Sequence, residues 1–271
     1  MITSVKSALV TGGGRGLGRA IALKLAEGGT RVGVLARTAS EVEATASEIR
    51  DAGGEARAFA TDVRDATGLR RAVAQFGEWA GGLDSLICSA GRLRGIGPLA
   101  AVEAEDWWLD LETSLKGVPL TIREAFSLLK ASPRASISVL VGPGHATNLP
   151  FASGYAAAQA GLVRLVECLE VEMRAEQIRV YAVHPGLVPT SLVQHLLDSL
   201  QGRRWLPGIT EAFAEGKEVG PEVVAETIAW LIEGRPLELS GRVVPALATP
   251  PILETRLARI QAEDLLRLRL R

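Results

Sequence analysis

The chain has 271 residues, of which 47% are hydrophobic and 4% aromatic, with 30 Lys plus Arg against 31 Asp plus Glu. A disordered chain would combine low hydrophobicity with a large net charge, and this chain has neither. Nucleic-acid-binding domains usually carry a basic excess, so no nucleic-acid partner is expected. The two cysteines and three scattered histidines indicate neither a disulfide framework nor a metal site, and a reducing, cytoplasmic compartment is the simpler expectation.

Apolar strand-like runs alternate with segments of helical periodicity along most of the chain. Strands are predicted at residues 5–10, 31–36, 55–60, 85–88, 135–141, 179–183 and 242–247. Helices are predicted at residues 16–27, 40–52, 65–79, 106–130, 154–174 and 221–232. This alternation is typical of a parallel sheet covered on both faces, which right-handed crossovers turn into a doubly wound sheet. We therefore predict an α/β fold, a single Rossmann domain over residues 1–250.

Two segments look appended to this domain. Residues 187–220 are less regular and are expected to form a lid over a ligand. In residues 251–271, Leu257, Ile260, Leu265 and Leu268 recur at helical spacing, so a C-terminal helical extension is predicted. Its expected role is packing or oligomer contact rather than membrane binding, and no run of about 18 apolar residues predicts a membrane span.

A glycine-rich loop follows the first predicted strand and opens the first predicted helix. Glycine allows the backbone to approach a pyrophosphate closely, and a helix N-terminus offers unpaired N–H groups and a partial positive charge. The position of the loop therefore predicts a dinucleotide site. The residues predicted to contribute are Thr11, Gly12, Gly14, Arg15, Gly16, Leu17 and Gly18.

The end of the second predicted strand indicates which dinucleotide is preferred. It reads Leu35-Ala36-Arg37-Thr38, without the carboxylate that NAD-binding sheets usually place there for the ribose 2′-hydroxyl. Arg37, together with Arg15 in the glycine loop, is suited to pair with a 2′-phosphate. The alternative is that both arginines are simply solvated. We predict NADP(H) in preference to NAD(H).

Four motifs together resemble the short-chain dehydrogenase/reductase family over residues 5–247. Thr11, Gly12, Gly16 and Gly18 match the TGxxxGxG pattern of that family. The resemblance implies a nicotinamide cofactor, a small-molecule substrate, and a dimer or tetramer made with itself or with a related chain. The further cofactor-binding residues that it implies are Asp62, Val63, Ser89, Ala90, Gly91, Pro185, Gly186, Val188 and Thr190.

The active-site positions depart from this family. The family uses Asn, Ser, Tyr and Lys, and only the tyrosine is kept, as Tyr155. Ser114, Gly142 and Gln159 stand at the other three positions. Loss of one hydrogen-bond donor to a reacting oxygen typically costs on the order of 10²–10³ in rate. A protonated Tyr155 is still able to act as an acid, so carbonyl reduction is expected to suffer less than alcohol oxidation.

Substitute groups are few. Gln159 is neutral and is able to hydrogen-bond but not to stabilise a tyrosinate by charge. Ser114 is a candidate for a replacement hydrogen bond. His145, three residues beyond Gly142, is a candidate acid or base, with an ordinary loop histidine as the alternative. If only the missing groups limit activity, the double change Gly142→Ser with Gln159→Lys is expected to raise it.

Three functions remain open from the sequence. The first is an atypical NADP(H)-dependent oxidoreductase acting on a carbonyl or alcohol. The second is a redox-silent structural or regulatory subunit beside an active homologue. The third is non-redox chemistry, such as dehydration, isomerisation or cyclisation, with Tyr155 as the acid.

Overall fold

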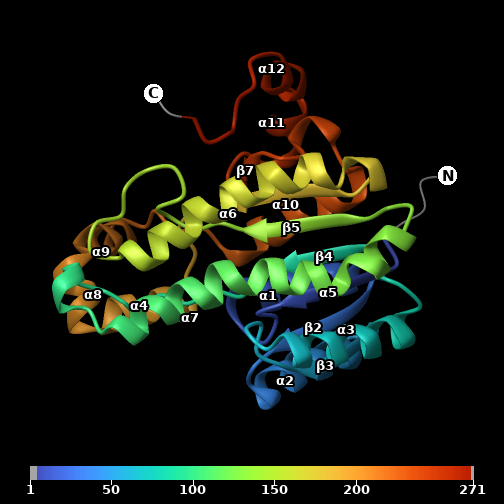
Figure 1. Ribbon diagram of the computed structural model, residues 1–271, viewed down its shortest axis with the longest axis horizontal. Helices are drawn as coiled ribbons and strands as arrows, with labels where there is room; N and C mark the ends of the chain where they lie inside the picture. The colour runs from blue at the N-terminus through green and yellow to red at the C-terminus, as the bar shows by residue number, and fades with distance from the viewer. Residues whose placement is uncertain (1–4, 270–271) are drawn as a thin grey trace.

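In residues 5–269, which the computed structural model describes, seven parallel strands form one sheet (Figure 1). The order in the sheet is β3-β2-β1-β4-β5-β6-β7. The predicted single-domain, doubly wound sheet is confirmed. The strands are β1 Ser7–Thr11, β2 Arg31–Ala36, β3 Ala56–Ala60, β4 Ser85–Cys88, β5 Ser136–Leu140, β6 Arg179–His184 and β7 Val243–Pro245.

The strand order changes direction beside β1. The chain runs outward through β2 and β3 and then returns to place β4 on the other side of β1, with Thr11 aligned to both Leu35 and Cys88. Because all strands are parallel, their carboxyl ends share one edge of the sheet. Ligands of open α/β sheets bind at this edge, where the order reverses.

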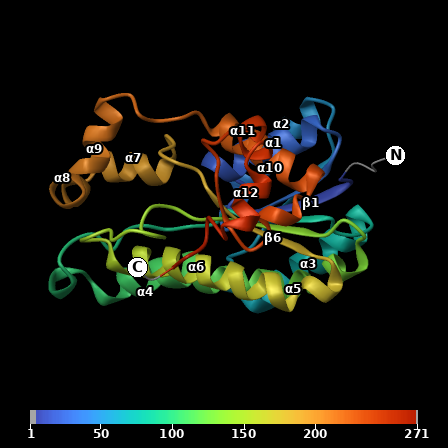
Figure 2. The same ribbon diagram turned by 90° about the horizontal axis from the view of Figure 1, so that it is seen from above.

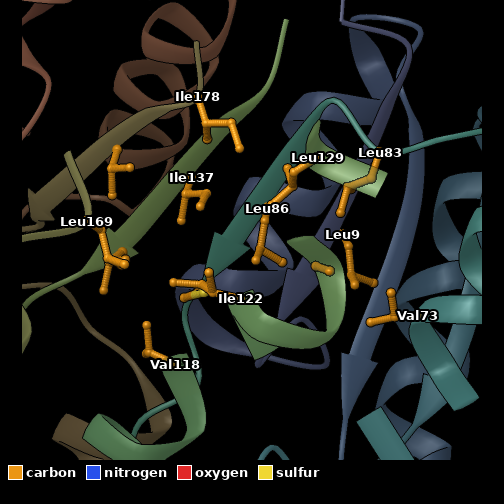
Figure 3. Packing of buried hydrophobic residues seen from close by; sticks show 14 of the residues in the cluster. Leu9, Val73, Leu83, Leu86, Val118, Ile122, Leu129, Ile137, Leu169 and Ile178 are labelled. Atoms are coloured by element: carbon orange, nitrogen blue, oxygen red, sulfur yellow. The ribbon is translucent and has the colours of Figure 1, made fainter. Parts of the chain in front are cut away.

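Helices cover both faces of the sheet, as Figure 2 shows. One layer holds α1 Gly16–Glu27, α2 Ala39–Asp51 and α10 Pro221–Gly234, and the other holds α3 Ala66–Ala80, α5 Gly117–Ala131 and α6 Ser153–Glu172. The central strands β1, β4 and β5 are almost wholly buried between the two layers, as expected for a parallel sheet covered on both faces. Figure 3 shows part of the core on the α5 side, where Leu9, Leu86 and Ile137 from three strands meet Ile122 and Leu129 of α5.

The long helix predicted over residues 106–130 is interrupted. The chain forms α4 Ala104–Leu111, a π-helical turn at Glu112–Lys116, and then α5. Pro119 has no N–H to donate to the carbonyl of Leu115, so a regular α-helix cannot continue through this turn. The wider turn buries Thr113 and Ser114 against the ligand edge of the sheet.

The segment predicted to be less regular is mostly helical. It contains α7 Ser191–Asp198, α8 Leu200–Trp205 and α9 Pro207–Ala214. Side-chain oxygens cap the first two helices, because Thr190 accepts from the Val193 N–H at 3.4 Å and Ser199 from the Gly202 N–H at 3.0 Å. Helices of six to eight residues carry little periodicity, which is why the pattern did not reveal them.

The C-terminal extension is helical only in part. It forms α11 Pro250–Glu254 and α12 Leu257–Ala262, after which Asp264 and Leu266 adopt left-handed backbone conformations that end the helix. The spacing of Leu265 and Leu268 therefore does not reflect a helix. Instead, the Leu266 carbonyl accepts from the Val243 N–H of β7 at 2.8 Å, and the Leu268 N–H donates to Glu167 of α6 at 2.8 Å.

Candidate active site

A cavity of about 590 Å³ lies at the carboxyl ends of the strands. It runs from the glycine loop and the end of β2, past the π-helical turn and α6, to helices α7 and α9. Every residue predicted from the sequence to bind the dinucleotide lines it, apart from Thr11. The buried Thr11 hydroxyl instead accepts from the N–H groups of Ser89 at 3.2 Å and Ala90 at 3.4 Å, so it ties the ends of β1 and β4 together.

Two positions of the glycine loop, Gly12 and Gly18, have no room for a side chain. A Cβ added to Gly12, which has a φ of +67°, would lie 2.8 Å from the Ala90 nitrogen. A Cβ added to Gly18 would overlap the Gly12 carbonyl and lie 3.0 Å from the Gly13 Cα. No side chain caps the first turn of α1, which leaves its N–H groups for a ligand. These features fit the pyrophosphate of a nicotinamide dinucleotide.

Two arginines line the cavity beside the glycine loop and the end of β2. Arg15 pairs with Glu41 at 3.2 Å, and more than half of its side chain is exposed. Arg37 also lines the cavity and has no ion-pair partner within residues 5–269. Burial of Asp62 opposes its ionisation, but hydrogen bonds and charge from Arg64, with a smaller contribution from Arg37, hold its pKa below the ordinary value.

Tyr155 and Gln159 lie one turn apart on α6 and line the same cavity, where they are 7% and 3% exposed. Gln159 Oε1 accepts a hydrogen bond from the Gly142 N–H at 2.8 Å, just beyond β5. The Tyr155 ring also points at Gly142, because a Cβ built there would overlap the phenolic oxygen and lie 3.1 Å from Cζ. These three residues therefore form one compact group.

Tyr155 keeps its proton in this environment. Burial raises its pKa, and the negative charge of Asp110 raises it further. The neutral Gln159 provides no compensating cation. Tyr155 is therefore able to donate a proton or a hydrogen bond, but it is a poor base at neutral pH.

Ser114 lines the cavity, but its hydroxyl is already engaged. Its Oγ accepts from the Arg92 N–H at 3.2 Å and donates to the Arg92 carbonyl at 3.3 Å. The side chain thus fixes the segment after β4 to the π-helical turn, and it is available to a ligand only if these bonds are exchanged.

His145 lies outside this cavity and lines a separate one of about 230 Å³ beneath the C-terminal segment. Its Nδ1 is 2.9 Å from the Gly142 carbonyl oxygen, and its ring centroid is 4.6 Å from that of His184. His184 lines both cavities. Tyr155, Gln159 and Ser114 therefore line one cavity, whereas His145 lines the other.

Sequence reasoning missed two parts of the site. The first is the apolar wall at the Tyr155 end of the cavity, where Leu192, Leu196 and Ile209 of α7 and α9 pack with Leu93 around Tyr155. The second is Asp110, which is fully buried, pairs with Arg92 and accepts from the Gly95 N–H at 2.7 Å. No local pattern distinguishes this aspartate from the exposed acidic residues of α4, because its partners lie 15 to 18 residues away.

Neither a metal-binding cluster nor a membrane-spanning helix is found among the described residues. Residues 5–269 contain no group of three or more His, Cys, Asp or Glu side chains placed to hold a metal ion. The same part of the chain contains no helix that is long and apolar enough to cross a membrane.

Comparison with known proteins agrees with this geometry. A sequence model of the short chain dehydrogenases matches residues 6–201. The 3-oxoacyl-[acyl-carrier-protein] reductase FabG of Staphylococcus aureus (strain N315) is 30% identical over 240 residues, covering 88% of this chain and 95% of FabG. The short chain dehydrogenase citE of Monascus ruber is 28% identical over 272 residues, covering 98% of this chain and 88% of citE.

Solved structures show the same likeness. A variant of actinorhodin polyketide ketoreductase with NADPH has a TM-score of 0.79 and 30% identity, covering 90% of this chain and 97% of that one. The family match at residues 6–201 includes strands β1 to β6 of the sheet. The chain therefore belongs to the short-chain dehydrogenase family and has the oxidoreductase fold of that family.

Proposed function

We propose that the protein is an NADP(H)-dependent reductase of apolar carbonyl compounds, with Tyr155 as the proton donor. The observation that carries this proposal is one continuous cavity, which the glycine loop lines at one end and Tyr155 at the other. NADPH, when bound, would supply the hydride. The N-terminus of α1 would hold its pyrophosphate, and Arg37 and Arg15 would pair with its 2′-phosphate.

Tyr155 suits reduction better than oxidation. Reduction of a carbonyl needs a proton for the oxygen that becomes an alkoxide, and a tyrosine with a raised pKa holds that proton ready. Oxidation would require the tyrosinate, which burial and Asp110 disfavour. Reduction is therefore the favoured direction near neutral pH.

The walls around Tyr155 support an apolar substrate. Leu93, Leu192, Leu196 and Ile209 surround the reacting end. Lys217 also lines the cavity, but its side chain is 67% exposed and pairs with Glu215. Apart from Arg15, Arg37 and Lys217, no Lys or Arg in residues 5–269 lines the cavity. A substrate carboxylate beside Tyr155 would therefore be unpaired, and burying an unpaired charge is costly. The names of the two reductases above, which act on 3-oxoacyl and polyketide carbonyls, also support reduction of a carbonyl.

The test is consumption of NADPH, followed by absorbance at 340 nm, across aldehydes and ketones in matched apolar and carboxylated pairs. We expect turnover of apolar members and a loss of about 10²–10⁴-fold in kcat with Tyr155→Phe. Tyr181→Phe is the matched control, because Tyr181 is buried in the sheet and its hydroxyl donates to the Pro236 carbonyl at 3.4 Å. Tight NADPH binding without turnover of any carbonyl would contradict the proposal and favour a redox-silent subunit.

A further inference from the structure

Neighbouring atoms, rather than backbone conformation, require a glycine at position 142. Its φ does not lie in the left-handed region, where glycine is favoured. What excludes a larger residue is Tyr155, because the phenolic oxygen occupies the position in which a Cβ at residue 142 would stand. Any side chain at this position would force Tyr155 out of its present place, and packed interiors tolerate such overlap poorly.

Gln159 holds the same glycine from the same helix. Its Oε1 accepts from the Gly142 N–H, and its side chain is almost fully buried. The backbone N–H is a donor, so the amide must face it with its oxygen and direct Nε2 elsewhere. A lysine has three donors and no acceptor, and a lysine at position 159 would leave the half-buried Gly142 N–H without this partner.

We propose that Gly142, Tyr155 and Gln159 form one interlocked unit, in which Gln159 is the positioning residue that holds the end of β5 against the catalytic tyrosine. The two departures from the family pattern then depend on each other. Gly142 makes room for the hydroxyl, and Gln159 secures the backbone that the hydroxyl contacts. The role of Gln159 in catalysis rests on the proposed function, whereas the packing of Tyr155 against Gly142 does not.

The geometry reverses an expectation drawn from the sequence. Reinstating the family residues by Gly142→Ser with Gln159→Lys should lower activity, because the serine Cβ overlaps the Tyr155 hydroxyl and the lysine cannot accept from residue 142. A misplacement of about 1 Å at a reacting group can cost about 10²-fold in rate. We expect kcat of this double variant to fall about 10–100-fold below that of the unchanged protein.

The first experiment needs no activity. Gly142→Ala is introduced into the unchanged protein and into Tyr155→Phe, and thermal unfolding is measured in all four proteins. Overpacking typically lowers Tm by about 2–10 °C in a domain of this size. We expect that fall in the unchanged protein and less than half of it in Tyr155→Phe, where the oxygen that overlaps the new methyl group is gone. An equal fall in both backgrounds, or none in either, would overturn the proposal.

The second experiment separates positioning from binding. With an apolar carbonyl that the protein reduces, Gln159→Met should lower kcat about 10–100-fold and change KM less than 3-fold. Gln159→Glu keeps an acceptor oxygen in either protonation state and should retain at least threefold more kcat than Gln159→Met. Gln261→Met, on the exposed face of α12, is the control.

The outcomes separate the two proposals. Equal kcat in Gln159→Met and Gln159→Glu, or a gain of activity in the Gly142→Ser with Gln159→Lys variant, would overturn the positioning role. If the unchanged protein reduces no carbonyl, the proposed function fails, whereas the unfolding measurements still decide whether Gly142 and Tyr155 are interlocked.

Discussion

At the nucleotide end of the cavity the backbone forms the site, whereas at the reacting end side chains from separate elements form it. Gly12 and Gly18 bring main-chain atoms into contact, and the first turn of α1 presents its N–H groups. At the other end, Tyr155 and Gln159 of α6 meet Gly142 beyond β5. A backbone site changes little when side chains vary, but a side-chain site is altered by each substitution. The reacting end should therefore be more sensitive to single side-chain substitutions than the nucleotide end.

Asp110→Asn tests how far the reacting end depends on a buried charge. Asp110 is fully buried, and breaking such a pair typically costs about 3–5 kcal/mol, so the apparent Tm should fall by about 6–20 °C. NADPH affinity, measured on the folded variant by fluorescence, should change less than 3-fold. Asp106→Asn is the control, because this partner of Arg92 is 43% exposed and should cost less than about 1 kcal/mol. A comparable loss in both variants would contradict the special role of Asp110.

Gly18→Ala tests the backbone end. The added methyl group overlaps the Gly12 carbonyl, so the loop must move away from the helix N-terminus. NADPH should bind on the order of 10²-fold more weakly, which corresponds to about 2.7 kcal/mol. Gly234→Ala at the end of α10 meets its nearest neighbour at 3.9 Å and should leave affinity unchanged. If Gly18→Ala binds NADPH as tightly as the unchanged protein, close main-chain contact is not what forms the nucleotide end of the site.

Arg37→Ala tests the choice of dinucleotide. A hydrogen bond to a charged group typically contributes about 1.5–3 kcal/mol, so NADPH affinity should fall about 10–100-fold while NADH affinity changes less than 3-fold. Titration calorimetry with both cofactors measures the difference. Arg57→Ala on the exposed side of β3 is the matched control. Equal weakening of NADPH and NADH would show that Arg37 does not discriminate between them.

The smallest effect concerns pH. Burial lowers the pKa of His145 from its ordinary value of 6.5, and the His184 ring adds to this, partly opposed by the hydrogen bond to the Gly142 carbonyl. Below pH 6.5 the unfolded chain binds a proton that the folded protein resists, so stability is present above that pH and is lost as the pH falls. His145→Asn, whose amide is able to donate to Gly142, should show a shallower fall in Tm between pH 7.5 and 5.5. If the slope of Tm against pH is the same in His145→Asn and the unchanged protein, His145 is not the source of the loss of stability at low pH.

Local patterns predicted most of the sheet and its helices. Helix α1 and strand β2 have the predicted bounds, because glycines end the first and a continuous apolar run defines the second. The break at residues 112–116 and the end of the helical tail at Ala262 were not predicted. Apolar spacing alone does not report a missing N–H at Pro119 or left-handed backbone at Asp264.

The amino-acid sequence by itself determined the α/β fold, the glycine loop and the residues around the nucleotide end, because these depend on short-range spacing and on glycine at defined places. It also predicted that Ser114, Gly142 and Gln159 stand at three positions of the family's active-site pattern. Only the tertiary structure decided how these residues are arranged. The Tyr155 hydroxyl meets Gly142 from 13 residues away, and Gln159 binds it from 17. His145, although only three residues from Gly142, turns into another cavity. Proximity along the chain does not set the direction of a side chain, and the packing of α6 on β5 does.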